Sequence, residues 1–193
     1  MNNFPQHVVD HGSLLYRIHH AANGAWFFRA DGLFRFDLTD RPGHGTCYFA
    51  ESPLGAFVET LQSFRSISLP RAEIAGRRLF AVKADFALVL ADVTDNAAGR
   101  YGIDASVGAS SASDYAHSQA LATRAFDAGF AGIRYHVRND LSQRLVGVAL
   151  FGPTGPHGDD LWPGDDQAIG EEIVALACRD LYFRTRGPLL DPA

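Results

Sequence analysis

Short apolar runs, separated by stretches rich in glycine, proline and aspartate, cover most of this chain. Runs of roughly four to eight residues bounded in this way are typical of strands. We expect strands at residues 14–18, 46–50, 78–86, 87–93, 131–137 and 145–151, and a short extended segment at 33–37. The last two strands, connected through an Asn139-Asp140 turn, are predicted to pair as a hairpin.

One helix is predicted directly after the strand at 46–50. Ser52 fits the N-cap position and Pro53 the first helical position. Glu59 lies about 100° around this helix from Val58, so it flanks the apolar face and is not at its centre. That face is formed at helical spacing by Leu54, Phe57, Val58, Leu61 and Phe64.

Two further helices complete the pattern. The first begins at Ser113 or Asp114 and runs to about residue 128, where Gly129 ends it. The second spans roughly 166–181. The connections at 39–45, 65–77, 94–113 and 152–166 are expected to be loops. Strands and helices mix without regular alternation, which predicts an α+β fold of mixed or antiparallel sheets with flanking helices.

Composition supports one domain over residues 1–193, because 47% of the residues are hydrophobic and only 20% are charged. The net charge of −5 and the lack of a basic stripe argue against direct nucleic-acid binding. No apolar stretch approaches the length of a membrane span, and no secretory signal is visible. We therefore expect a cytoplasmic protein, and the strong preference for arginine over lysine suggests a bacterial one.

Several familiar chemistries lack their sequence motifs. There is no Gly-x-Gly-x-x-Gly, no Gly-x-x-x-x-Gly-Lys-Ser/Thr and no Gly-x-Ser-x-Gly, which argues against Rossmann, P-loop and α/β-hydrolase sites. The two cysteines form no disulfide framework. His44-x-x-Cys47 has no matching second pair, so no metal site is expected.

Two arginines occupy apolar settings, Arg17 in Leu-Leu-Tyr-Arg-Ile and Arg35 in Leu-Phe-Arg-Phe-Asp. A buried arginine needs an anionic partner. An internal carboxylate is one such partner. The pyrophosphate of a nucleotide is the other, since arginine forms bidentate hydrogen bonds with phosphate oxygens.

Three other side chains also admit two interpretations. Tyr48 is either a core aromatic or a stacking surface for a flat ring such as nicotinamide. Glu59 is either a solvated helix residue or a carboxylate that binds ribose hydroxyls and stabilises an oxocarbenium-like state. Ser118 lies near the start of a helix, where its hydroxyl faces solvent or contacts a phosphate.

Taken in order, these segments resemble the RES-domain family, which includes toxins of RES–Xre toxin–antitoxin pairs. The resemblance covers about residues 14–151 and rests on the following segments: Leu-Tyr-Arg17-Ile, Phe-Arg35-Phe-Asp, the run from Gly45 to Glu59, Gly-Phe-Ala-Gly-Ile-Arg-Tyr and Val-Ala-Leu-Phe. Each segment alone is weak, but their order and spacing are fairly specific.

The resemblance implies an ADP-ribosyltransferase-like fold that binds NAD as its substrate and cleaves the nicotinamide–ribose bond. Phosphate or water would be the acceptor, and no metal is implied. Carried over by position, Arg17 and Arg35 would bind phosphates, Tyr48 would flank the nicotinamide ribose and Glu59 would act on that ribose. The family serine corresponds to Ser118 or, more distantly, Ser142. Asp37 replaces a common asparagine and would weaken NAD binding or pair with an arginine.

Two alternatives keep the same fold. The first is ADP-ribosyl transfer to a protein or small molecule, and the second is a nucleotide-binding domain without catalysis. The family also implies an Xre-type antitoxin as partner. A homo-oligomer is a further prediction, through Ile169, Ile173, Val174 and Leu176 of the last helix, although core packing explains these residues equally well.

Overall fold

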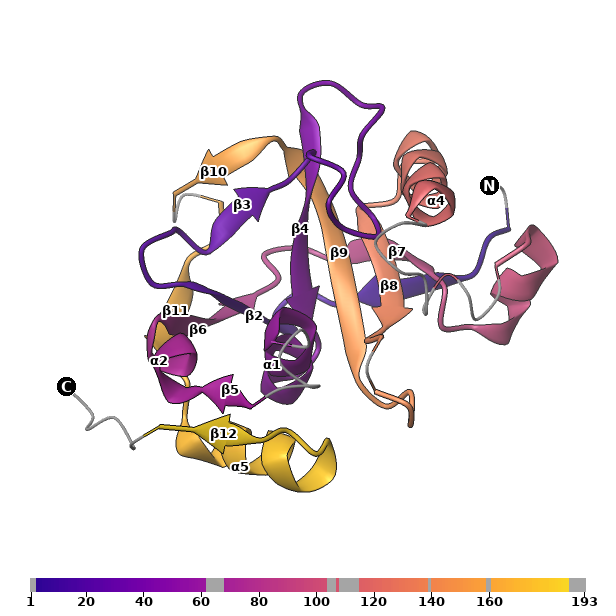
Figure 1. The fold of residues 1–193 in the computed structure, drawn as a ribbon. Coiled ribbons are helices and arrows are strands. Elements are labelled where there is room, and N and C mark those ends of the chain that lie inside the picture. Colours follow the sequence, from indigo (N-terminus) through magenta and orange to yellow (C-terminus); the bar gives the residue numbers. More distant parts are fainter. Residues whose placement is uncertain are drawn as a thin grey trace.

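An eight-stranded mixed sheet forms the centre of the computed structural model, which describes residues 3–61, 68–103, 107, 115–138, 140–158 and 161–187 (Figure 1). The strands follow the order β1-β7-β8-β9-β4-β2-β6-β11, and all neighbours are antiparallel except β7 and β8. Their bounds are β1 (Gln6–Val9), β2 (Leu14–His20), β4 (His44–Ala50), β6 (Arg77–Lys83), β7 (Leu88–Asp92), β8 (Gly132–His136), β9 (Val146–Pro153) and β11 (Gly164–Ala168).

Two small sheets and a set of helices flank this sheet. The small sheets pair β3 (Trp26–Phe28) with β10 (Gly155–His157), and β5 (Leu69–Pro70) with β12 (Thr185–Arg186). The helices are α1 (Pro53–Leu61), α2 (Arg71–Ala75), α4 (Ala116–Asp127), α5 (Glu171–Asp180) and the 3-10 helix η2 (Asn96–Tyr101). None of the described helices is long and apolar enough to cross a membrane.

The expected start of α1 is confirmed. Ser52 Oγ accepts the backbone N–H of Gly55 over 3.1 Å, and Pro53 is the first helical residue. Phe57, Val58 and Leu61 are buried, while Glu59 on the flank is partly exposed. Phe64, the last residue of the predicted apolar face, lies outside the described residues.

The sheet is nearly interrupted between β2 and β4. These two strands share a single registered pair, Tyr16 with Ala50, whereas β4 pairs with β9 over its whole length. Helix α1 packs against both β2 and β4 near this interruption (Figure 1). Unpaired strand edges beside a helix leave room for side chains that come from both halves of the sheet.

Apolar side chains fill both faces of the sheet and the layer beneath α1. One cluster lies between α4 and the sheet and includes Phe36, Leu121 and Ile133. Another packs α5 against α1 through residues such as Ile173 and Val174. These two residues are therefore core, and the apolar surface expected to support a homo-oligomer is not present at these positions.

Three expectations about secondary structure are wrong. Residues 33–37 form a turn, because the carboxylate of Asp37 accepts the N–H of Phe34 and closes it. The expected loops at 65–77, 94–113 and 152–166 contain short elements, including β5, α2, η2 and β10. The last helix begins at Glu171 and not near 166, because residues 164–168 pair with β6 as an edge strand.

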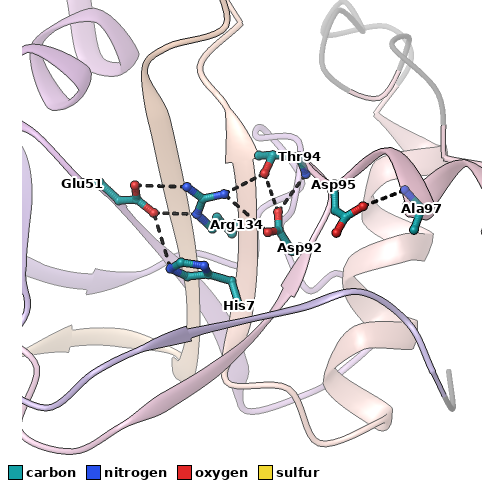
Figure 2. Close-up of polar contacts among 7 residues, drawn as sticks. All are labelled: His7, Glu51, Asp92, Thr94, Asp95, Ala97 and Arg134. Carbon is teal, nitrogen blue, oxygen red and sulfur yellow. Dashed lines mark hydrogen bonds and ion pairs between the residues drawn. The ribbon is translucent and has the colours of Figure 1, made fainter.

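A charged network ties β8 to the start of α1 (Figure 2). Arg134 donates two hydrogen bonds to the carboxylate of Glu51, at 2.6 and 3.3 Å, one residue before the Ser52 cap. Its third guanidinium nitrogen, Nη1, donates to the carboxylate of Asp92 at 3.4 Å and to the hydroxyl of Thr94 at 2.7 Å. Asp92 is the last residue of β7. Bidentate arginine–carboxylate pairs fix geometry as well as charge, so this network sets the position of α1 relative to β8.

Candidate active site

A buried ion pair joins the 33–37 turn to α1. Arg35, which is 5% exposed, donates from Nη2 to Oε1 of Glu59 over 3.3 Å, and the Glu59 side chain is 15% exposed. Burial by itself lowers the pKa of Arg35, but the negative charge of Glu59 acts in the opposite direction, and the net pKa lies above its usual value. The guanidinium therefore stays charged, and Glu59 is held beside a fixed cation.

Tyr135 of β8 lies against this pair. The guanidinium carbon of Arg35 is 4.8 Å from the centroid of the Tyr135 ring, a cation–π contact. Burial first, and then the negative charge of Glu59, raise the pKa of Tyr135 well above its usual value. Tyr135 ends the Gly-Phe-Ala-Gly-Ile-Arg-Tyr segment of the family resemblance, but its alternation with Ile133 predicts only a core residue.

Arg17 of β2 spans the interruption in the sheet. Its Nη1 donates to the backbone carbonyl of Tyr48 on β4 over 2.9 Å. Its Nε is buried and has no hydrogen-bond partner among the described residues. The positive charge of Arg17 also acts against the rise in the pKa of Tyr135, so this arginine and Arg35 both bear on the same buried region.

Tyr48 and Asp37 hold the turn that carries Arg35. The Tyr48 hydroxyl donates to Asp37 Oδ1 over 2.9 Å and accepts the N–H of Phe36 at the same distance. Asp37 also accepts the N–H of Phe34, and no arginine contacts it within the described chain. The expected Asp37–arginine pair is thus wrong. The hydroxyl of Tyr48 anchors the turn, while the Tyr48 ring lies 5.5 Å from that of Phe34.

Asp37 gives the protein a pH-dependent stability. Burial raises the pKa of Asp37 from 3.8 to about 6, against the lowering effect of the Tyr48 hydroxyl. Between these values the folded state binds more protons than the unfolded state, so stability falls as pH rises from about 4 to about 6. We predict that Asp37→Asn removes this slope. Urea unfolding at several pH values measures it, and an identical slope in both proteins would contradict the assignment.

Neither serine candidate has a hydrogen bond to the ion pair among the bonds of the described residues. Ser118 is 1% exposed, and its hydroxyl donates to the Tyr115 carbonyl of its own helix over 3.0 Å. The next residue, Gln119, donates to the carbonyls of Gly32 and Phe34, which places α4 beside the Arg35 turn. Ser142 instead donates to Asp140 and belongs to the loop that this aspartate organises.

Unsatisfied polar atoms concentrate at this site. Within the described residues, six buried side-chain atoms lack hydrogen-bond partners, and three of them are Arg17 Nε, Glu59 Oε2 and Tyr135 Oη. Most buried polar groups in folded proteins are paired. Two of these three atoms are donors and one is a carboxylate oxygen. A polar ligand that bound here could satisfy all three.

A cavity of about 270 Å³ adjoins the buried pair through Phe36 and Tyr135, both of which contact Arg35. Its lining also includes Thr94 and His136. A larger cavity of about 450 Å³ near Lys83 shares no residue with the site, so we place the candidate chemistry beside the smaller one. The described residues contain no group of three or more His, Cys, Asp or Glu side chains that could hold a metal ion.

The architecture is that of a known class. A chain in the crystal structure of the M. tuberculosis MbcT–MbcA toxin–antitoxin complex superposes with a TM-score of 0.59 and 15% sequence identity, over 88% of this chain and 91% of that chain. The expected α+β, ADP-ribosyltransferase-like fold with a mixed sheet and flanking helices is confirmed.

The family follows from the sequence itself. The sequence model of the RES domain matches residues 14–169, and the protein belongs to the RES-domain family. The match starts at the first residue of the resemblance described above and extends beyond its expected end at 151. A search of curated proteins finds no match.

Proposed function

We propose that this protein is a toxin-type enzyme that consumes NAD by cleaving its nicotinamide–ribose bond, with phosphate or water as the acceptor. Membership in the RES-domain family supports an NAD-directed activity. The observation that carries the proposal is the Glu59 carboxylate, which has one oxygen held by Arg35 and the other buried and unpaired among the described residues.

The site suits an anionic substrate that develops positive charge. Arg17 and Arg35 supply two guanidinium groups that can bind a pyrophosphate, although the chain carries a net charge of −5. Arg17 is the better phosphate ligand, because its Nε is buried without a partner in the described chain, whereas Arg35 donates a hydrogen bond to Glu59. Tyr48 maintains the turn and flanks the ribose.

The bond cleavage needs little acid or base chemistry. When the C1–N bond of the nicotinamide ribose breaks, its electron pair moves to the pyridinium ring, and nicotinamide leaves as a neutral molecule. Positive charge then develops on the ribose, where the carboxylate of Glu59 stabilises it. Phosphate or water attacks C1, and the water reaction releases one proton to solvent. Ser118 would reach a phosphate only if its hydroxyl left the Tyr115 carbonyl, to which it donates while 1% exposed.

A toxin of this kind needs restraint in its host. The similar fold in a toxin–antitoxin complex supports a protein antitoxin as partner, and the family resemblance suggests the Xre type. Expression that arrests growth, with relief by the product of a neighbouring gene, would support this partner. Growth that is unaffected by expression of the active enzyme would contradict a toxin role.

The direct test follows nicotinamide release. The purified protein is incubated with NAD, with and without inorganic phosphate, and products are identified by mass. We expect free nicotinamide together with ADP-ribose-1″-phosphate for phosphorolysis or ADP-ribose for hydrolysis. Label that becomes attached to protein would establish ADP-ribosyl transfer instead. NAD that binds tightly without turnover would identify a binding domain and overturn the enzyme proposal.

A further inference from the structure

We infer that Tyr135 is a specificity-determining residue that, together with Glu59, binds one hydroxyl of the nicotinamide ribose. The inference rests on the proposed function for the identity of the sugar. It adds to the site a residue from β8 whose ring lies against the Arg35 guanidinium.

The first observation is a pair of orphaned atoms. Tyr135 is 1% exposed, and its Oη has no hydrogen-bond partner in the described part of the chain. Glu59 Oε2 is buried and equally unpaired there. The two groups are close enough for the charge of Glu59 to contribute to the raised pKa of Tyr135, after burial. Glu59 and the Tyr135 hydroxyl interact closely enough to raise the pKa of Tyr135 further, yet neither Tyr135 Oη nor Glu59 Oε2 makes a hydrogen bond of good geometry among the described residues.

The second observation is their complementary chemistry. Because burial keeps the phenol protonated, Tyr135 offers an O–H donor. The carboxylate of Glu59 offers only acceptors. A sugar hydroxyl is both donor and acceptor, so one hydroxyl placed between them accepts from Tyr135 and donates to Glu59. A ring nitrogen or carbonyl oxygen without a hydrogen satisfies only one of the two.

The third observation is that the fold makes room for this phenol. Gly147 of β9 stands opposite Tyr135, and a Cβ there would lie 2.4 Å from the ring carbon Cζ and 2.6 Å from Oη. Arg35 lies over one part of the ring at 4.8 Å, and the Phe36 ring is 4.9 Å away. Neighbours on β9 and on the 33–37 turn therefore fix the direction of the Tyr135 hydroxyl, and none of them binds it.

The experiment compares the kcat/KM of the wild type and of Tyr135→Phe on NAD and on substrates that lack one sugar hydroxyl. NAD is compared with two analogues in which the 2- or the 3-hydroxyl of the nicotinamide ribose is replaced by hydrogen. We expect Tyr135→Phe to lower kcat/KM for NAD by about 10- to 100-fold, and by less than about 3-fold for the analogue that lacks the recognised hydroxyl. Equal losses for all three substrates would overturn the inference, since Tyr135 would then act through Glu59 or the fold.

A binding measurement separates this inference from the proposed function. Calorimetry gives the dissociation constant of ADP-ribose for the wild type and for Tyr135→Phe, independently of cleavage. If the wild type releases no nicotinamide, but Tyr135→Phe binds ADP-ribose more weakly than the wild type does, the result contradicts the enzyme proposal and supports the sugar contact. Equal or undetectable affinity in both proteins overturns the contact.

Two controls guard against a general loss of structure. Tyr182→Phe makes the same chemical change at a residue that is 79% exposed, and it should leave kcat/KM unchanged. The phenylalanine at 135 keeps the ring that Arg35 covers, so the thermal transition should remain cooperative. The wild type's own discrimination between NAD and the two analogues requires no variant at all, and the absence of discrimination also counts against the inference.

Discussion

Replacing Glu59 by glutamine should reduce nicotinamide release by about 100- to 1,000-fold, the usual effect of removing one group that stabilises charge in the transition state. The amide keeps the shape of the side chain, and its carbonyl oxygen can still accept from Arg35, so the fold should be retained. The lost element is the negative charge opposite the ribose. Initial rates of nicotinamide release at saturating and limiting NAD measure the effect.

The matched control for this prediction is Glu172→Gln. Glu172 is an exposed residue in the first turn of α5, outside the site, and its substitution should leave the rate unchanged. A Glu59→Gln protein that retains wild-type kcat would exclude the proposed role of this carboxylate. A loss confined to KM would instead assign Glu59 to substrate binding alone.

The parts of the site with strong local patterns were predictable from the sequence. Ser52 and Pro53 begin α1 as expected, because an N-cap side chain and a proline at the first position are local determinants. The burial of Arg35 beside an acid was one of two stated interpretations, and the structure identifies Glu59 as the acid. Its use as a phosphate ligand stays a prediction.

The parts that depend on distant contacts were not predictable. Residues 164–168 (Gly-Asp-Asp-Gln-Ala) are exposed throughout and show no apolar alternation, so nothing in their pattern predicts an edge strand; only pairing with β6 does. The partners of Asp37 are the Tyr48 hydroxyl, which comes from another strand, and a backbone N–H within its own turn. The role of Tyr135 depends on its contacts with Gly147 and Arg35, which come from distant parts of the chain.

A substitution that removes the buried cation should destabilise the protein more than any surface change. Arg35→Met leaves the Glu59 carboxylate buried beside an apolar side chain, and breaking a buried pair from one side costs about 3–5 kcal/mol. Arg35 is 5% exposed and packs on the Tyr135 and Phe36 rings, so water cannot readily replace it. Urea denaturation, read as a change in midpoint at constant slope, measures the loss.

The double substitution Arg35→Met with Glu59→Gln shows whether the cost arises from the unpaired charge. Once the carboxylate is neutral, the desolvation penalty falls, and the double variant should be more stable than Arg35→Met alone by about 1–2 kcal/mol. Arg179→Met, at a surface ion pair with Asp180, should leave the midpoint unchanged. If adding Glu59→Gln gave no recovery, the loss would come from the packing of Arg35 on the two rings. The Arg35 side chain would then stabilise the fold through packing, and the charges of the pair would affect substrate binding and cleavage but not stability.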